Sequence, residues 1–416
     1  MTVKEKSVVI IGGGVIGAAC AHFLAESNWS VTIIDKAGFG KACSHANCGL
    51  IALSHVLPLN EPGAIKKTFK ALLSRNSPFK IKPRLDWNLW SWLLKFARRC
   101  NHRDMLEFAR ARAQLLDSSG RLFPEILSKE GIECEWEQVG CLFVYQSKKG
   151  MAGYAATDKL LRDEFGVAAS RYDGSELVDL EPALVGGLGG GWHYEMDCHI
   201  RPDKLMSNWK EALIRKGVEI KENCEFTGII GNGSASAIAT NQGDIPADAF
   251  LVATGAVTPL LNKHLGCKIP IQPGKGYSIT MPRPEKCPRI PMLLQEHKVG
   301  VTPMASGYRL GSTMEFSGYD ETLNSRRLNL LREGATHYLH QPYTEPVEEQ
   351  WYGWRPMTYD GKPIIDRCPK YSNVWIAAGH NMLGLTMAPG TGKLVAELLN
   401  DEKPHVDPKP FSVTRF

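Results

Sequence analysis

The sequence predicts an α/β fold, α+β overall, in which a nucleotide-binding domain is interleaved with a substrate domain built on an antiparallel sheet. Three observations predict it. Residues 7–35 read as strand, helix and strand, residues 270–316 alternate and turn like antiparallel strands, and residues 373–400 read as a strand, a glycine turn and a helix. Because the first and last patterns suit one domain and the middle pattern another, the chain is expected to leave its first domain and return to it.

The bulk composition is that of an ordinary globular protein of two domains, with 416 residues, 43% hydrophobic and 22% charged. We expect no cleavable signal, because glycines interrupt the first apolar run, and no stretch reaches the roughly 20 apolar residues of a membrane-spanning helix. Eleven cysteines without a C-x-x-C pair indicate reduced thiols, no metal site and a cytoplasmic protein. A net charge of +5 is too small to indicate nucleic-acid binding.

Residues 7–35, SVVIIGGGVIGAACAHFLAESNWSVTIID, form the expected β-α-β unit. Gly12, Gly14 and Gly17 take the G-x-G-x-x-G positions, which serve a tight turn, close approach to a pyrophosphate, and close packing of helix on strand. Asp35 ends the second strand, where an acidic side chain accepts a hydrogen bond from a ribose hydroxyl. The unit predicts a Rossmann-like dinucleotide site and leaves both NAD and FAD open.

Residues 61–135 are predicted to be mainly helical, and the segment 61–103 within them is basic. Its basic residues are Lys66, Lys67, Lys70, Arg75, Lys80, Lys82, Arg84, Lys95, Arg98, Arg99 and Arg103, against Glu61 and Asp86. Trp87 and Trp90 stand at helical spacing among them, which suits peripheral contact with an anionic membrane. The other interpretation is a solvated helix whose tryptophans belong to the core.

Residues 248–259, DAFLVATGAVTP, read as a buried strand that ends at Thr254 and Gly255. The backbone there can approach a cofactor at the carboxyl edge of a sheet, and a core strand with a glycine turn explains the pattern equally well. The strands of residues 270–316 are expected to cover a substrate site. The predicted nucleotide-binding domain comprises residues 1–60, 201–265 and 351–416, and the substrate domain residues 61–200 and 266–350.

Residues 353–366, GWRPMTYDGKPIID, contain one arginine between a glycine and a proline, just before the last predicted strand. The guanidinium of Arg355 is a rigid fork that matches a carboxylate at two points, so a pocket for an amino or keto acid could use it. A single arginine is also common as a surface or structural residue.

Six segments in this order carry a resemblance: GGGVIG with Asp35, CSHANCG, PGKGYSIT, GYRLGSTMEF, GWRPMTYDGKPIID and AAGHNMLGLTMAPGTG. Together they resemble the FAD-dependent D-amino-acid oxidase (DAO) superfamily, and most of all its bacterial D-amino-acid dehydrogenase branch. The resemblance runs from the first strand to the last helix. It implies a flavoprotein with non-covalently bound FAD, so the first predicted domain becomes the FAD-binding domain.

The resemblance also implies roles for single residues. Gly12, Gly14 and Gly17 would contact the pyrophosphate, Asp35 the adenosine ribose, and Arg355 the substrate carboxylate. Further cofactor contacts would come from Ser44, His45, Asn47, Cys48, Gly49, Gly255, His380, Gly384, Leu385 and Thr386, the last three at the pyrimidine end of the flavin, where a helix N-terminus stabilises negative charge.

Tyr277 and His297 are further candidate catalytic residues, and the assignments of Tyr277, Cys48 and His380 each carry an alternative. Tyr277 either binds substrate or packs, and His297 stands near a position at which related enzymes often carry a tyrosine that faces the substrate. Cys48 is either a small filler beside the flavin or a redox-sensitive thiol, and His380 either contacts the flavin or is structural.

The implied reaction is oxidative deamination of a D-amino acid, or of a cyclic D-imino acid such as D-proline or hydroxy-D-proline. Hydride passes from Cα to flavin N5, the imine hydrolyses to a 2-oxo acid and ammonia, and electrons pass to a quinone or another carrier. One alternative is an oxidase for glycine, sarcosine or D-amino acids that uses oxygen. A second is a non-enzymatic flavoprotein that assists assembly of a respiratory complex, which should lack a functional carboxylate-binding arginine.

Overall fold

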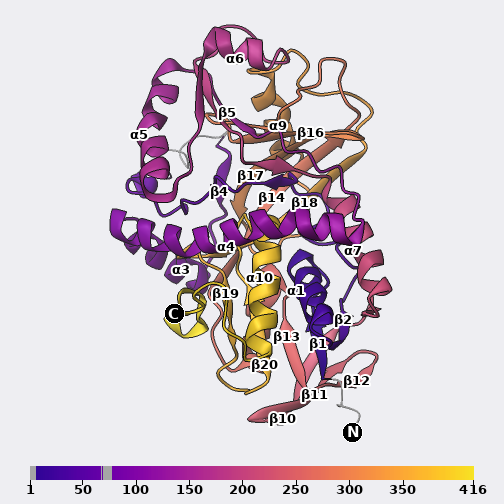
Figure 1. Ribbon diagram of the computed structural model, residues 1–416. Helices are drawn as coiled ribbons and strands as arrows, with labels where there is room; N and C mark the ends of the chain where they lie inside the picture. Colours follow the sequence, from indigo (N-terminus) through magenta and orange to yellow (C-terminus); the bar gives the residue numbers. More distant parts are fainter. Residues whose placement is uncertain (1–5, 67, 69–76) are drawn as a thin grey trace.

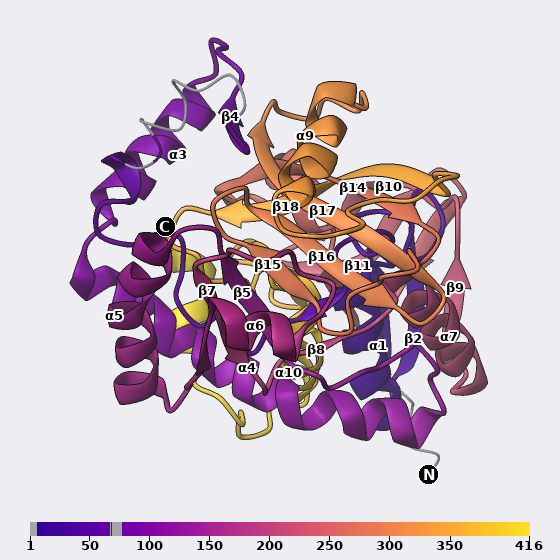
Figure 2. The same ribbon diagram turned by 90° about the horizontal axis from the view of Figure 1, so that it is seen from above.

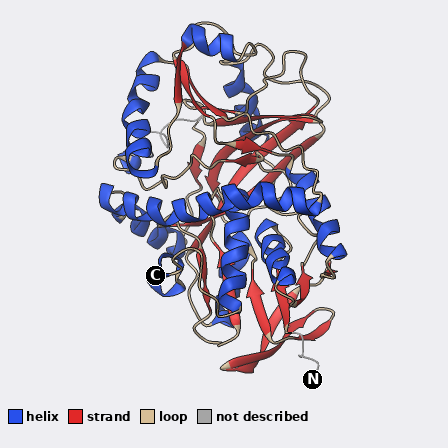
Figure 3. Cartoon of the chain, in the orientation of Figure 1, coloured by secondary structure: helices blue, strands red, loops and turns tan. Residues whose placement is uncertain are grey.

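The computed structural model describes residues 6–66, 68 and 77–416 (Figure 1). Lys67, Lys70 and Arg75 of the basic segment lie outside the described residues. The described chain forms two main sheets, one parallel and one largely antiparallel, with a long helix between them (Figures 1 and 3). The predicted α/β class, with two interleaved sheets, is confirmed.

The first sheet has six strands in the order β19-β20-β13-β1-β2-β9. Its strands are β1 (Ser7–Ile11), β2 (Ser30–Ile34), β9 (Glu219–Lys221), β13 (Ala249–Val252), β19 (Ile364–Arg367) and β20 (Val374–Ala378). All neighbours are parallel except β19, which pairs antiparallel with β20. The apolar runs of β1, β13 and β20 are continuous because both faces of the sheet are covered there.

Helices α1 (Val15–Glu26) and α10 (Gly384–Leu399) lie side by side on this sheet (Figure 1). Small residues let them approach closely, since a Cβ at Gly392 would lie 2.5 Å from Ala19 O. Helix α4 (His102–Glu130) crosses over α10, and its Ser119 Oγ accepts a hydrogen bond of 2.9 Å from Gly390 N. The long helix therefore ties the N-terminal and C-terminal parts of the first domain together.

The second sheet has nine strands, in the order β18-β14-β17-β16-β15-β5-β7-β6 with β4 beside β17. Its strands are β4 (Phe79–Ile81), β5 (Cys141–Tyr145), β6 (Ser170–Asp173), β7 (Gly190–Tyr194), β14 (Ile271–Met281), β15 (Met292–Leu294), β16 (Val299–Met304), β17 (Gly307–Phe316) and β18 (Glu349–Thr358). The predicted antiparallel strands of residues 270–316 are confirmed as β14 to β17. Strand β18 crosses the predicted boundary at residue 351; the domain boundaries stay a prediction.

The two faces of the nine-stranded sheet meet different parts of the molecule. One face packs on α9 (Ser325–Thr336) in an apolar cluster that includes Ile279, Leu310 and Leu331. Figure 2 shows α9 over the outside of this sheet. The opposite face meets the polar segment of residues 43–49, which follows the β1-α1-β2 unit. We call it the site face.

The remaining described elements complete the two domains. They are β3 (Leu50–Ile51), β8 (Cys198–His199), β10 (Phe226–Asn232), β11 (Ser234–Thr240), β12 (Gly243–Pro246), α3 (Trp87–Arg98), α5 (Lys148–Phe165), α6 (Gly174–Leu180), α7 (Pro202–Arg215), α8 (Asn262–Leu265) and the 3-10 helices η1 (Gly255–Leu261), η2 (Lys409–Phe411) and η3 (Val413–Arg415). Within the described ranges, no helix has both the length and the apolar character needed to cross a bilayer.

Candidate active site

The β1-α1 turn has the geometry of a nucleotide-binding turn. Gly12 has φ of +113°, and a Cβ there would lie 2.6 Å from Ala253 O. A Cβ at Gly17 would overlap Gly12 O, so α1 can lie against the turn only without one. Asp35 accepts hydrogen bonds from Gly13 N (2.8 Å) and Ala37 N (2.9 Å), which hold its carboxylate beside the turn.

Gly14 leaves the N-terminus of α1 open. The nearest atom to a Cβ at Gly14 would be Ser44 Oγ, 3.4 Å away, so space remains in front of the helix. No acidic residue stands in the first turn of α1, and Ser44 Oγ accepts the hydrogen bond of Val15 N at 2.9 Å. This helix end can therefore receive a phosphate group against its backbone N–H groups.

Three polar side chains of the site face hold residues 46–48. They come from neighbouring strands and donate to successive backbone carbonyls: Ser278 Oγ to Ala46 O (2.7 Å), Arg309 Nη1 to Asn47 O (2.8 Å) and Thr302 Oγ1 to Cys48 O (2.6 Å). These three residues are not among those predicted from the sequence. In the sequence they alternate with apolar residues in β14, β16 and β17. That alternation does not say which set of residues faces residues 46–48, because this depends on the strand register.

The ends of the same segment are also fixed. His45 Nε2 lies 2.7 Å from Glu349 Oε1, and this contact holds the pKa of Glu349 below its ordinary value. Asn47 bridges its own loop, since its Oδ1 accepts from Gly49 N (2.9 Å) and its Nδ2 donates to Cys43 O (3.2 Å). The segment from Ser44 to Gly49 is thus a rigid strip between the two sheets.

Arg355 lies on the site face of β18. Its Nη1 donates to Thr313 O at 2.8 Å, and a Cβ at Gly276 would overlap the guanidinium. Desolvation lowers the pKa of Arg355, and part of the residue stays accessible. Among the described residues, no carboxylate forms an ion pair with it. The guanidinium is therefore ready for an anionic ligand.

Two glycines leave part of the site face beside Arg355 without side chains of its own. Gly300 of β16 and Gly311 of β17 are paired in register, and a Cβ at Gly311 would lie 2.6 Å from Cys48 Sγ. The Cys48 side chain occupies the room that the glycines leave, and burial raises its thiol pKa. Its position fits the filler role; the redox alternative stays a prediction.

The N-terminus of α10 is a second helix end without an acidic first turn or a capping side chain. Gly384 and Leu385 begin it, and Thr386 Oγ1 accepts a hydrogen bond of 3.1 Å from Ala52 N. His380 lies just before the helix, buried, with Nε2 3.0 Å from Thr391 Oγ1. Burial lowers the pKa of His380 to about 3, so it is neutral and holds the turn.

Two further predicted cofactor contacts lie at backbone turns. Gly255 follows β13 with φ of +58°, and no heavy atom would lie within 4 Å of a Cβ there. Gly49 has φ of +69°, and a Cβ there would overlap Ile200 O. Gly49 is explained by packing, whereas the space around Gly255 keeps it open to a ligand.

Tyr277 and His297 lie apart from Arg355. Tyr277 alternates with Gly276 and Ser278 in β14, so it points to the α9 side, where its OH donates to Glu315 Oε2 at 2.9 Å. His297 lies in the turn between β15 and β16, stacked on His337 with ring centroids 4.6 Å apart. The geometry supports the packing alternative for Tyr277, and we leave both residues out of the site that we propose.

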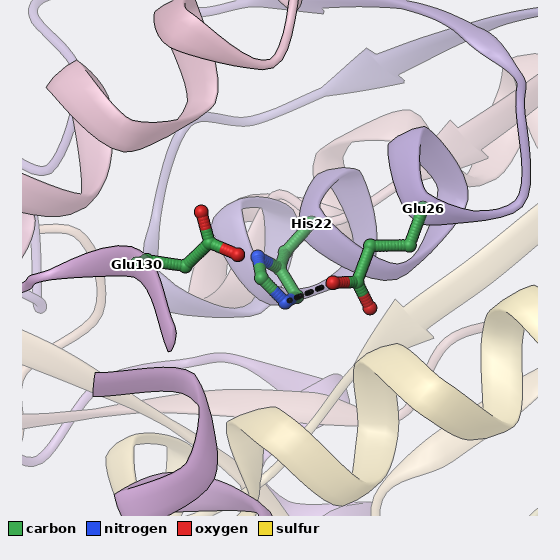
Figure 4. Close-up of side chains that lie close together, drawn as sticks. All are labelled: His22, Glu26 and Glu130. Carbon is green, nitrogen blue, oxygen red and sulfur yellow. Dashed lines mark ion pairs between the residues drawn. The ribbon is translucent and has the colours of Figure 1, made fainter. Parts of the chain in front are cut away.

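One group of described side chains has the composition of a metal site. His22, Glu26 and Glu130 place their ligand atoms within 4.8 Å of one another, with the His22 ring between the two carboxylates (Figure 4). Lysines already neutralise both: Lys129 Nζ lies 2.5 Å from Glu26 Oε1, and Lys216 Nζ lies 2.8 Å from Glu130 Oε1. The cluster is an ion-pair network that joins α1 to the end of α4.

These features fit a dinucleotide with a flavin. The open end of α1 and Asp35 suit the adenosine diphosphate half, and the strip of residues 44–49 leads to the uncapped end of α10. Arg355 lies on the sheet above that strip. The residues present therefore match the FAD site that the sequence predicts.

Comparisons with known proteins agree with this geometry. The sequence profile of the DAO family, described as FAD dependent oxidoreductase, matches residues 7–398. A protein from Granulibacter bethesdensis named D-amino acid dehydrogenase is 29% identical over 98% of this chain and 99% of its own length. One of the same name from Vibrio atlanticus is 31% identical with the same coverage.

Solved structures share the fold. Glycine oxidase from Geobacillus kaustophilus superposes with a TM-score of 0.80 at 21% identity, covering 99% of this chain and 100% of that one. L-proline dehydrogenase from P. horikoshii superposes with a TM-score of 0.73, also at 21% identity, covering 100% of this chain and 98% of that one. With the profile match over nearly the whole chain, these findings establish that the protein belongs to the DAO family of FAD-dependent oxidoreductases.

Proposed function

We propose that this enzyme oxidises a D-amino acid, or a cyclic D-imino acid, and passes the electrons to a carrier other than oxygen. The observation that carries the proposal is Arg355, a desolvated guanidinium on the site face without an ion-pair partner among the described carboxylates. The names of the relatives, D-amino acid dehydrogenase, support the substrate class and the type of acceptor.

Arg355 would bind the substrate carboxylate at two points. Thr313 O already accepts from its Nη1, and this contact fixes the plane of the fork. Gly276 lies against the guanidinium and contributes no side chain of its own that could compete for it. The remaining donors would orient the substrate so that its Cα lies in one defined place, which is how a positioning residue lowers the barrier.

Bound FAD would supply the acceptor for the hydride, which carries both of the electrons that leave the substrate. The substrate loses a hydride from Cα and a proton from nitrogen. The imine of an open-chain amino acid then adds water to give a 2-oxo acid and ammonium, whereas a cyclic imino acid gives a cyclic imine that keeps its nitrogen. The protein would hold the acid through Arg355. The polar contacts of Ser278, Thr302 and Arg309 keep the strip of residues 46–48 in one position throughout.

We further propose that α3 brings the enzyme to an anionic membrane surface, where a quinone could accept the electrons. Trp92 is buried and donates to Met357 O at 3.1 Å, so one face of the helix belongs to the core. The other face exposes Trp87 by 88%, Leu94 by 53% and Trp90 by 48%. Lys95 and Arg98 lie in its last turn, and basic charge beside exposed tryptophan suits the headgroup region.

The substrate proposal is tested by dye-linked turnover on matched D- and L-amino acids, including D-proline and 4-hydroxy-D-proline, with hydrogen peroxide followed in parallel. We expect dye reduction by D-acids with little peroxide. Peroxide at a comparable rate would identify an oxidase, and reduction by L-acids alone would overturn the stereochemical assignment. Silence on every acid would favour the assembly-factor alternative.

The membrane proposal is tested by sedimentation with anionic phospholipid vesicles. Replacing Trp87 and Leu94 together by serine should lower the vesicle-bound fraction about tenfold. Ile214→Ser on α7 is the control, because it removes an apolar side chain that is as exposed as Leu94, 54%, but lies away from α3. Equal binding of all three proteins, or no binding of the unaltered protein, would contradict the proposal.

A further inference from the structure

A cavity of about 310 Å³ lies between α3, η1, the start of β14 and the end of β17. Aromatic rings form part of its wall, contributed by Trp92, Tyr319 and Tyr359. The polar atoms of two of these rings already have partners, since Trp92 Nε1 donates to Met357 O and Tyr319 OH donates to Ala256 O. The rings therefore offer apolar surface, and the volume suits a ligand with a ring of its own. The proposed mechanism does not use this cavity.

Two polar side chains of the wall have no partner within the described residues. Gln272 of β14 is only 8% exposed, and no hydrogen bond reaches its side-chain amide. Ser317 Oγ, just beyond the end of β17, is buried and likewise has no hydrogen-bond partner. Since buried polar groups are normally hydrogen-bonded, these two are expected to bind a polar atom of a ligand in the cavity.

The charge around the cavity favours electron-rich oxygen atoms. Lys95 Nζ lies 5.2 Å from the ring centre of Tyr359, and Lys268 is an exposed residue of the wall. Among the described residues, no carboxylate forms an ion pair with either lysine, because Asp86 of the wall pairs with Arg84 at 2.9 Å. Two such cations, together with the two unpartnered polar groups, suit carbonyl oxygens on which negative charge develops during reduction.

The cavity shares its walls with two segments that the sequence predicts to contact FAD. Helix η1 lines the cavity and begins at Gly255. On another wall Ile271 lies against Gly379, since a Cβ there would be 3.4 Å from Ile271 Cδ1, and His380 follows in the chain. Electron transfer does not need contact between donor and acceptor. A ligand in the cavity would therefore be able to take electrons from a flavin on the other side of these walls.

The cavity opens beside the face of α3 that we propose for membrane contact. Asn88 and Ser91 line the cavity and are exposed. They share one side of the helix with Lys95, and this side adjoins the one that exposes Trp87 and Trp90. A ligand dissolved in the bilayer would thus meet the cavity where the enzyme contacts the membrane.

We propose that this cavity binds the electron acceptor, a quinone, whose carbonyl oxygens accept hydrogen bonds from Gln272 Nε2 and Ser317 Oγ. The inference rests on the proposed function, and it gives the acceptor a site separate from that of the amino acid. The hydride and the proton that the substrate loses amount to two electrons and two protons. A quinone that receives them by way of FAD becomes a hydroquinone, so the reaction balances without another oxidant.

The test measures reoxidation of the FAD-loaded enzyme after anaerobic reduction by a D-amino acid. The acceptor is a ubiquinone analogue with a single isoprene unit, and no vesicles are present. The rate should saturate as the quinone concentration rises. Gln272→Leu removes a hydrogen bond and should raise the half-saturating quinone concentration about tenfold. Reduction of the flavin by the amino acid should stay within about twofold in the same variant.

Ser91→Trp covers the case in which Gln272→Leu fails to fold. It fills the mouth of the cavity from an exposed position of α3, and Ser128→Trp, at an exposed position of α4, is the matched control. Ser91→Trp should raise the half-saturating concentration about tenfold, and the control should leave it within about twofold.

Three results overturn the inference alone. The first is a reoxidation rate that rises linearly with the quinone concentration. The second is unchanged half-saturation in both cavity variants. The third is an equal loss in reduction of the flavin by the amino acid, because the cavity would then belong to the amino-acid site.

If the unaltered enzyme oxidises no amino acid, the proposed function fails first. Calorimetric titration of the oxidised, FAD-loaded enzyme with the same quinone analogue then tests the cavity by itself. Binding that Ser91→Trp weakens about tenfold would support the quinone site. No binding to the unaltered protein would overturn it.

Discussion

The two faces of the nine-stranded sheet carry opposite chemistry. On the α9 side, Ile279, Val301 and Leu310 pack in an apolar cluster that includes Tyr277. On the site face, the residues next to them in sequence are Ser278, Thr302 and Arg309, and each donates to a backbone carbonyl of residues 46–48. The alternation of β-strands thus separates stability from function within single strands.

One charged side chain on each face, Glu315 and Arg355, differs in whether another side chain of the protein contacts its charged group. Glu315, on the α9 side, accepts from Tyr277 OH, so the protein itself satisfies its carboxylate. Arg355, on the site face, has only a backbone carbonyl as a partner among the described residues. Since a desolvated charge without an ion-pair partner is costly, the face that keeps Arg355 in this state is the face expected to bind a ligand.

The largest effect is expected at Arg355. Arg355→Ala should lower kcat/KM for D-amino acids about 10²–10³-fold, because it removes the partner of a desolvated carboxylate. FAD should stay bound, as its absorbance would show. Arg355→Lys should recover only part of the loss, since a lysine lacks the fork. Unchanged kinetics in Arg355→Ala would contradict the conclusion that the site face, in contrast to the α9 side, binds the substrate.

Asp197, beneath the site face, gives a pH-dependent effect of intermediate size. Burial raises its pKa from about 4 to about 7 in the folded protein. Between these values the folded state binds more protons than the unfolded state, so this contribution is complete below pH 4 and is lost as pH rises through 7. From pH 5 to pH 8 the free energy of unfolding should fall about 2–3 kcal/mol more in the unaltered protein than in Asp197→Asn. Urea unfolding at the two pH values measures this, and parallel losses would contradict the assigned pKa.

On the α9 side, Tyr277→Phe should affect stability and not kinetics. The change leaves the buried Glu315 without its hydroxyl partner and should cost about 1–3 kcal/mol of unfolding free energy. Thermal unfolding measures the loss, and kcat/KM should stay within about twofold. A tenfold loss of kcat/KM with unchanged stability would return Tyr277 to the substrate site.

The smallest effect is expected at Thr302. Thr302→Val keeps the shape of the side chain and removes the hydrogen bond to Cys48 O, which should cost about 1 kcal/mol. Because the strip of residues 46–48 is part of the proposed flavin site, the loss should appear as weaker FAD retention on dilution. Val301→Ala, on the other face, is the control, which should lower stability without changing FAD retention.

The parts predicted from sequence are those whose signals are local. Gly12, Gly14 and Gly17 stand within one turn and helix, so their spacing alone specifies the nucleotide-binding unit. The alternation in residues 270–316 likewise predicted the antiparallel strands.

The parts that sequence could not give depend on register and on distant contacts. Ser312 and Thr313 have positive φ at a shift in the pairing of β14 with β17. Simple alternation along the sequence therefore does not show which residues of β17 lie on which face of the sheet. Asp197 contacts Ser54 from 143 residues away, and no pattern links the two. In α3, Trp92 is buried whereas Trp87 and Trp90 are exposed, so the core interpretation fits only one face of the helix, and membrane contact of the other face stays a prediction.

The most direct test is anaerobic reduction of the bound FAD, followed by absorbance, with three forms of one compound. These are the best D-amino acid of the dye-linked panel, its L-enantiomer and its D-carboxamide. If Arg355 binds the substrate carboxylate on the site face, the D-acid should bleach the flavin, and the other two should do so at least about 100-fold more slowly. Equal bleaching by the carboxamide would contradict the role of Arg355, and equal bleaching by the L-acid would contradict the proposed substrate class.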